Sequence, residues 1–265
     1  MNEKVVLITG ASGGIGAGMA RLFAKHRATV AVHYRTREEG ANKVVDDIIA
    51  AGGQAKTFYA DLRSEKAINR LVVEVIKAFD VIDCLVNNAG IVLKTYLKDT
   101  SSELWDDILN INLRAPHLLS QAVLPHLRDG GSVIHNTSIH AKNSVPNFGA
   151  YAASKAALES LAQVQALEWA ERGIRVNCVA PGVVPVERTT EALQAASKDW
   201  LPHIPRGRYG TVEEIAEMTL WLASDRAGWV TGQSFVVDGG MTARIDMPKR
   251  DRIAPPPAPD SINEH

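Results

Sequence analysis

The chain has 265 residues, of which 46% are hydrophobic and 22% charged, which is enough apolar sequence to bury the core of one α/β domain. Its 29 lysines and arginines nearly balance 30 aspartates and glutamates, so we expect neither nucleic acid nor membrane as a partner. The short apolar run at the N-terminus predicts no signal peptide and no membrane span, hence a cytoplasmic protein. Cys84 and Cys178 lie in apolar runs, which predicts buried free thiols and no metal site.

Short β-branched runs alternate with longer helical patterns along the chain, as in βα units on a parallel sheet. We expect strands at residues 4–9, 29–33, 54–59, 82–86, 132–137, 174–179 and 234–237, and helices at 14–25, 37–51, 64–79, 103–127 and 150–172. Capping boxes are expected at Thr100 with Glu103 and at Thr211 with Glu214. The pattern predicts an α/β fold: a single-domain, Rossmann-type, doubly wound parallel sheet of about seven strands with helices on both faces.

The chain shows no internal repeat and no boundary between two folded domains. We expect one NAD(P)-binding catalytic domain at residues 1–247. Residues 248–265 are rich in proline, and we expect a disordered tail there. The alternative for this tail is a segment that covers a neighbouring subunit.

A glycine-rich turn joins the first strand to the first helix. It reads Thr9-Gly-Ala-Ser-Gly-Gly-Ile-Gly16. Glycines allow the backbone to turn tightly and to approach a pyrophosphate, and the helix N-terminus offers free N–H groups to the phosphates. The turn therefore predicts a dinucleotide site.

Further motifs follow this turn in a fixed order: Asn87-Asn-Ala-Gly90, Asn112, Ser138, Tyr151-Ala-Ala-Ser-Lys155, Pro181-Gly182 and Asp238-Gly-Gly240. With its TGxxxGIG spacing, the chain resembles the short-chain dehydrogenase/reductase family over everything before the tail. The resemblance implies an enzyme that binds NAD(P). It also implies cofactor contacts from Gly10, Ser12, Gly14, Ile15, Gly16, Asp61, Leu62, Asn88, Ala89, Gly90, Tyr151, Lys155, Pro181, Gly182 and Val184.

The end of the second strand bears on the choice between NAD and NADP. The carboxylate that NAD-preferring relatives place there is replaced by Tyr34, and Arg35 follows. A guanidinium suits a 2′-phosphate, and Arg37 could assist it, so we expect a preference for NADP(H) over NAD(H). Many NADP-using relatives carry a basic residue where this chain has Gly13. The alternative is that both arginines are a solvated start to the next helix.

Tyr151 and Lys155 are expected one turn apart on the same helix face. A nearby ammonium favours a phenolate, so Tyr151 is predicted to act as general acid/base on a carbonyl or secondary alcohol. By resemblance, Lys155 also binds the nicotinamide ribose, Ser138 holds the reacting oxygen, and Asn112 holds a water behind the lysine. Asn112, Ser138, Tyr151 and Lys155 are therefore the expected catalytic residues.

The sequence says less about the substrate. Relatives often have a threonine where Val186 falls, for which Thr189 or Thr190 could substitute, and Glu187 begins the segment that resembles a lid. The chain is similar both to 3-oxoacyl thioester reductases and to sugar or alcohol dehydrogenases. The alternative function is a non-catalytic regulator that senses NADP(H). The resemblance also implies a homotetramer formed through the two long helices.

Overall fold

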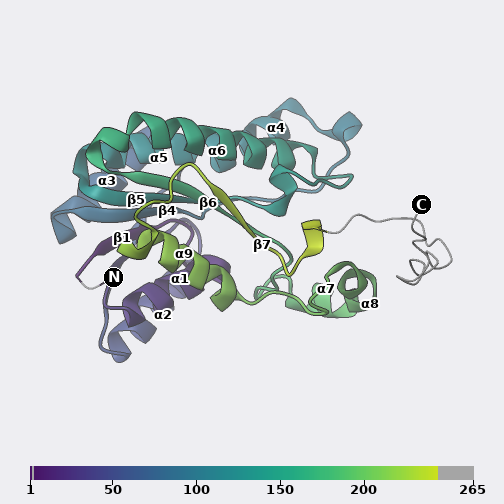
Figure 1. Ribbon diagram of the computed structural model, residues 1–265, viewed down its shortest axis with the longest axis horizontal. Helices are drawn as coiled ribbons and strands as arrows, with labels where there is room; N and C mark the ends of the chain where they lie inside the picture. The colour runs from purple at the N-terminus through teal and green to yellow at the C-terminus, as the bar shows by residue number, and fades with distance from the viewer. Residues whose placement is uncertain (2, 244–265) are drawn as a thin grey trace, which may run out of the picture.

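The computed structural model describes residue 1 and residues 3–243 (Figure 1). The predicted tail and the predicted end of the domain at residue 247 lie outside these residues. Within them, every helix is too short or too polar to cross a membrane.

Seven parallel strands form one sheet in the order β3-β2-β1-β4-β5-β6-β7. The inner strands are continuous apolar runs because both of their faces are covered, and every residue of β1, β4 and β6 is buried. The strands are β1 (Val5–Ile8), β2 (Thr29–Tyr34), β3 (Gln54–Tyr59), β4 (Ile82–Asn87), β5 (Leu127–Asn136), β6 (Arg175–Pro181) and β7 (Ser234–Val237).

Helices cover both faces of the sheet (Figure 1). One layer holds α1 (Gly14–Lys25), α2 (Glu38–Ala50) and α9 (Val212–Ala223), and the other holds α3 (Glu65–Phe79), α4 (Ser102–Leu109), α5 (Ala115–Val123) and α6 (Gly149–Glu168). Each layer packs its own apolar core against the sheet. The short helices α7 (Thr190–Ala195) and α8 (Ser197–Trp200) follow β6, apart from both layers. The predicted doubly wound sheet is therefore confirmed.

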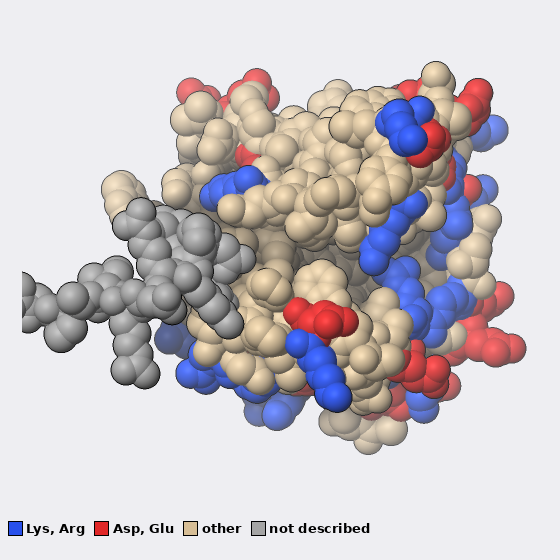
Figure 2. Space-filling model, turned by 90° about the vertical axis from the view of Figure 1, so that its right-hand side faces the viewer, with Lys and Arg blue, Asp and Glu red and all other residues tan. Residues whose placement is uncertain are grey.

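The strand order places a crevice between β1 and β4. The chain continues from β1 to β2 on one side and from β4 to β5 on the other, and the helices that follow these two strands lie on opposite faces of the sheet. In open parallel sheets, ligands bind where the order reverses, beyond the carboxyl ends of the strands. Seen from that end, the surface is hollowed and basic side chains border part of the hollow (Figure 2).

The long helix predicted at residues 103–127 is interrupted. Between α4 and α5 the chain forms a five-residue π-helical turn, Asn110–Arg114. Pro116, in the first turn of α5, lacks the N–H that would bond to the carbonyl of residue 112, which explains a break in the ladder at this point. The predicted end of the helix is also wrong, because Leu127 begins β5 and pairs with Ile82 of β4.

Two further predictions concern helix ends. Thr211 and Glu214 form the expected capping box at α9. The box expected at Thr100 is wrong: Ser101 caps α4 and accepts a hydrogen bond from Leu104 N, because the helix begins one residue later. The helix predicted at 150–172 is α6 followed by a 3₁₀ turn, Ala170–Arg172, before Gly173 at φ +66°.

Candidate active site

The glycine turn leaves β1 and enters α1 at the floor of the crevice. Gly10 has φ +63°, a conformation that favours glycine, and a β-carbon there would lie 3.0 Å from the Cα of Ala89. A β-carbon on Gly16 would lie 2.5 Å from the Nδ2 of Asn88. The turn therefore packs so closely against the loop after β4 that side chains are excluded at both positions.

His33, at the end of β2, fixes the other side of this turn. Its Nδ1 accepts a hydrogen bond from Gly10 N at 3.1 Å, and its Nε2 lies 3.1 Å from the carbonyl oxygen of Ala60. These partners require the neutral imidazole with its proton on Nε2. Burial lowers the pKa of His33 to about 4, which keeps the ring neutral. His33 lines the cavity, and nothing in the sequence alone distinguished it from other strand residues.

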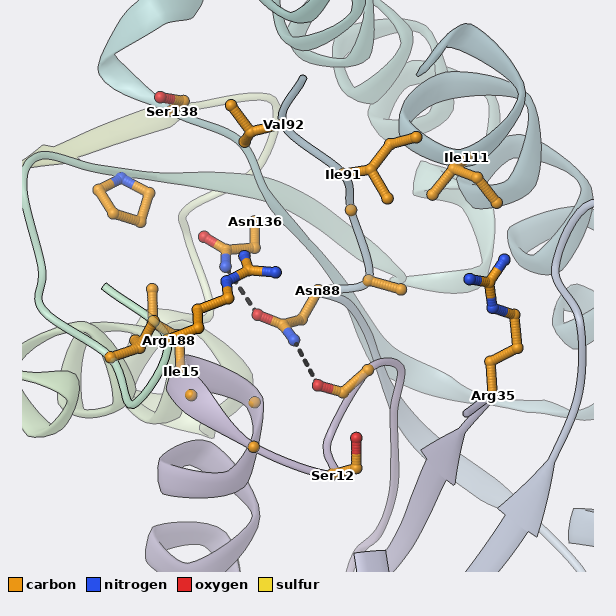
Figure 3. Close-up of a pocket in the computed structure, with 18 of the residues that line it drawn as sticks. Ser12, Ile15, Arg35, Asn88, Ile91, Val92, Ile111, Asn136, Ser138 and Arg188 are labelled. Carbon is orange, nitrogen blue, oxygen red and sulfur yellow. Dashed lines mark hydrogen bonds between the residues drawn. The ribbon is translucent and has the colours of Figure 1, made fainter. Parts of the chain in front are cut away.

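A chain of amide side chains connects the glycine turn to the reacting end. Asn88 Nδ2 donates to the carbonyl oxygens of Thr9 and Gly10 at 2.9 and 3.2 Å, and its Oδ1 accepts from Asn136 Nδ2 at 2.8 Å (Figure 3). The backbone oxygen of Asn136 accepts from Lys155 Nζ at 2.7 Å. Asn136 is a residue that the sequence analysis missed, because only its contacts reveal its place in this network.

Three arginines border the cavity at the ends of β2 and β3: Arg35, Arg37 and Arg63. Arg63 forms an ion pair with Asp107 at 2.6 Å, whereas Arg35 and Arg37 form none with the described residues. The guanidinium of Arg37 lies over Gly13, so that a β-carbon on residue 13 would overlap it. Arg37 thus places a positive charge beside position 13.

The four expected catalytic residues come together near the carboxyl ends of β4 and β5. Ser138 lies two residues beyond the end of β5, and Tyr151 and Lys155 lie on α6. Asn112, in the π-helical turn, is fully buried behind the cavity wall. Its Nδ2 donates to Ile91 O and its Oδ1 accepts from Ile91 N, both at 2.9 Å. Asn112 therefore positions the loop that follows Gly90, as well as lying next to Lys155.

Burial affects the protonation of both Tyr151 and Lys155. Burial raises the pKa of Tyr151, against the opposing effects of the Ser138 hydrogen bond and the charge of Arg188. The ammonium of Lys155 donates to the backbone oxygen of Asn136 and lies 5.8 Å from the centre of the tyrosine ring, and the effect of Lys155 on Tyr151 stays a prediction. Burial also lowers the pKa of Lys155 to about 8.

The segment after β6 forms the remaining wall. Val186 N donates to Thr189 Oγ1 at 3.0 Å, and Thr189 N donates to Val186 O at 2.7 Å, which closes a tight turn. Both oxygens of Glu187 lie close to Gly14 N, at 3.2 and 3.0 Å. The side chain of Arg188 extends from this segment toward the middle of the cavity (Figure 3). Thr189 lines the cavity, as expected if it substitutes for the threonine that relatives carry at the position of Val186. Its hydroxyl, however, is hydrogen-bonded to the backbone of Val186.

The expected cofactor residues line one cavity of about 430 Å³, with one exception. Asp61 is not among the residues of its wall: its carboxylate accepts from Arg63 N at 3.0 Å, and Arg63 lines the cavity. Of the catalytic set, Asn112 lies behind the wall. The others line the cavity: Gly10, Ser12, Gly14, Ile15, Gly16, Arg35, Leu62, Asn88, Ala89, Gly90, Ser138, Tyr151, Lys155, Pro181, Gly182 and Val184.

Two aromatic rings, those of His140 and Phe148, lie next to Tyr151. His140 stacks on Phe148 with ring centres 4.5 Å apart, and both rings meet Tyr151 edge-on with centres 6.1 Å away. Lys94 Nζ lies 5.3 Å from the centre of the Phe148 ring. These rings hold the side chain of Tyr151 in place.

Within the described residues, no group of three potential metal ligands lies together.

Comparisons with known proteins agree with this arrangement. A family model described as enoyl-(acyl carrier protein) reductase matches residues 10–242. A 3beta-hydroxysteroid dehydrogenase 1 from Eggerthella lenta is 38% identical over 249 residues, covering 91% of this chain and 95% of that protein. The 3-oxoacyl-[acyl-carrier-protein] reductase FabG of Thermotoga maritima is 36% identical over 243 residues, covering 91% and 98%.

The fold also matches solved structures over nearly the same span. A short-chain dehydrogenase from Burkholderia cenocepacia, solved in complex with NADP, superposes with a TM-score of 0.86 at 34% identity, covering 91% of this chain and 98% of that one. Motifs, sheet order and relatives agree. The chain belongs to the short-chain dehydrogenase/reductase family and is an oxidoreductase of that family.

Proposed function

We propose that this protein uses NADP(H) to interconvert a carbonyl group and a secondary alcohol, with Tyr151 as the general acid/base. The observation that carries the proposal is that Ser138, Tyr151 and Lys155 line the same cavity as the glycine turn and Arg35. A dinucleotide that lies along this cavity reaches from the arginines, across the N-terminus of α1, to the tyrosine.

The residues of the cavity fit such a ligand. The glycine turn leaves a cradle at the N-terminus of α1, where N–H groups and the helix dipole attract phosphates. The Oδ1 of Asn136 is buried at the cavity without a hydrogen-bond partner among the described residues, and it is available to a ribose hydroxyl. When bound, the nicotinamide supplies or accepts the hydride.

Proton transfer falls to the protein's own side chains. Ser138 and Tyr151 line the same cavity, and Ser138 opposes the rise in the pKa of Tyr151, so a substrate oxygen between the two hydroxyls would accept from both. Tyr151 then donates its proton to the developing alkoxide, or accepts it in the reverse direction. Lys155, with a pKa lowered to about 8, exchanges its proton readily near neutrality, and its charge favours the phenolate when its ammonium turns toward the ring.

The preference for NADP(H) rests on Arg35 and Arg37. Both are exposed, both line the cavity where β2 ends, and neither has an acidic partner among the described residues. A 2′-phosphate would be an acidic partner for both arginines, and it suits the bidentate geometry that guanidinium groups favour. The neighbour solved with NADP supports this preference.

The substrate class is a ketone or secondary alcohol of the 3-oxoacyl, steroid, sugar or simple alcohol type. The relatives named as a 3-oxoacyl reductase and a hydroxysteroid dehydrogenase support it. The test is a panel of these compounds with NADPH or NADP, followed by absorbance of the reduced nicotinamide. Turnover of a ketone or alcohol supports the proposal. Binding of NADPH without turnover of any compound favours the alternative, a regulator that senses the cofactor.

We further propose a homotetramer. On the outer face of α6, Val164 is 47% and Leu167 79% exposed, an arrangement that favours helix packing across a two-fold axis. Sedimentation at micromolar concentration tests the assembly, and a monomer would contradict it. The cytoplasmic location stays a prediction.

A further inference from the structure

A carboxylate from the segment after β6 lies at the N-terminus of α1. The two oxygens of Glu187 are 3.2 and 3.0 Å from Gly14 N, and the residues are 173 positions apart. Gly14 is the first residue of a twelve-residue helix whose N-cap, Gly13, provides no side-chain acceptor. No acidic residue lies in the first turn of this helix either. The helix therefore obtains its anion from a distant part of the chain.

This position is the one where the proposed function requires phosphates. Gly14 and Glu187 both line the cavity, together with Gly10, Ser12 and Gly16. The free N–H groups at a helix N-terminus bind one anion well, because each N–H points at a single acceptor. A pyrophosphate and a carboxylate at the same N–H would repel each other.

Hydrogen bonds hold the backbone turn that carries Glu187, so this turn helps to position the carboxylate. Val186 and Thr189 close that turn through two hydrogen bonds, and Thr190 Oγ1 donates to Val186 O at 2.9 Å. The side chain of Val186 also packs on the glycine turn, since a β-carbon on Gly14 would lie 3.3 Å from Val186 Cγ1. The segment thus docks on α1 by an apolar and a charged contact.

We propose that Glu187 is a residue that sets the affinity for the cofactor: its carboxylate competes with the pyrophosphate for the N-terminus of α1 and leaves when the cofactor binds. The inference rests on the proposed function, because it takes the cavity to be a dinucleotide site. Arg188, the next residue, already extends into the cavity (Figure 3). When the phosphates replace the carboxylate of Glu187, that negative charge moves away from them, and the positive charge of Arg188 stays beside them.

The test compares Glu187→Gln with the wild-type protein. Glutamine keeps the size of the side chain and a neutral acceptor for Gly14 N, but removes the charge. An exposed anion at a helix N-terminus contributes an effect of about two- to fivefold in an equilibrium constant. We therefore expect the dissociation constant for NADPH, measured by calorimetry, to fall by about two- to fivefold. Glu191→Gln is the matched control, because Glu191 carries the same charge, is exposed and lies in the first turn of α7.

Inorganic pyrophosphate is the second probe, and it should bind Glu187→Gln more tightly by a similar factor. An unchanged or weaker affinity in Glu187→Gln overturns the inference. An equal gain in Glu187→Gln and Glu191→Gln also overturns it, since the effect would then be one of net charge. If the wild-type protein binds neither NADPH nor NADH, the proposed function fails, and the pyrophosphate titration still decides on Glu187.

Discussion

The ammonium of Lys155 donates a hydrogen bond to the backbone oxygen of Asn136, at 2.7 Å. This contact ties α6 to the end of β5, and through the side chain of Asn136 it reaches Asn88 and the glycine turn. The lysine is thus placed by the same network that shapes the cofactor cradle. We therefore expect substitutions in the glycine turn to affect the position of Lys155, and substitutions of Lys155 to affect the glycine turn.

Tyr151→Phe should abolish most turnover while leaving the cofactor site intact. The variant removes only the hydroxyl, and loss of a general acid/base lowers rates by roughly 10²- to 10⁴-fold. We expect kcat to fall within that range and the dissociation constant for NADPH to stay unchanged. Tyr59→Phe, at an exposed residue of β3, is the control. Full activity of Tyr151→Phe would remove the tyrosine from the mechanism.

Lys155→Met should impair both turnover and cofactor affinity. Lys155 lines the cavity and is held by Asn136, so methionine removes a charge from the reacting end and a donor from the network. We expect a lower kcat and a weaker binding of NADPH, measured by steady-state kinetics and calorimetry. Lys66→Met, at an exposed position of α3, should change neither. A loss of kcat alone would show that Lys155 does not bind the cofactor.

Arg35→Ala and Arg37→Ala should discriminate between the two cofactors. Hydrogen bonds to charged groups are worth about 1.5–3 kcal/mol, or roughly ten- to a hundredfold in affinity. We expect KM for NADPH to rise by about tenfold or more in each variant, with little change for NADH, which lacks the 2′-phosphate. Arg70→Ala on α3 serves as a control for charge. Equal losses with both cofactors would contradict a role in selecting NADP(H).

Two buried histidines should make the fold sensitive to acid. Burial lowers the pKa of His33 and of His135 to about 4 each, below the usual 6.5. Between these values the unfolded chain binds the protons and the folded chain does not. The free energy of unfolding should therefore fall as the pH drops from 6.5 to 4, by up to about 1.4 kcal/mol per pH unit for each histidine.

Denaturant unfolding at several pH values measures this slope. His135→Gln should reduce it by the share of one histidine, because glutamine does not titrate. His26→Gln, at an exposed position of the chain, is the control. An unchanged slope in His135→Gln would mean that His135 is protonated in the fold.

Asn112→Ala should destabilise the loop that follows Gly90. The alanine leaves the N–H and the carbonyl of Ile91 without their partners, and each buried unpaired group costs about 1–3 kcal/mol. We expect a lower free energy of unfolding and a lower kcat, with Asn110→Ala in the same turn as control. If stability and kcat both stay at the wild-type level, the asparagine has no positioning role.

The sequence predicted those parts of the site in which the chemistry demands a residue type. Gly10 is needed for its positive φ, Tyr151 for its hydroxyl, and Lys155 for its charge, so a motif can reveal them. The contacts of His33, Asn136 and Glu187 were not predicted, because their partners are 23, 48 and 173 residues away and only the folded chain brings them together. The strands were predictable for the same reason as Gly10, since burial on both faces demands apolar runs.

The π-helical turn at Asn110–Arg114 places a limit on the length of the chain at this point. A π-helical turn closes its hydrogen bonds over one residue more than an α-helical turn, so deleting one residue here would convert it to a regular α-helical turn and change which side chains face the loop after Gly90. Asn112 could then no longer face Ile91. Over evolution, the number of residues in this segment should therefore vary less than their identity.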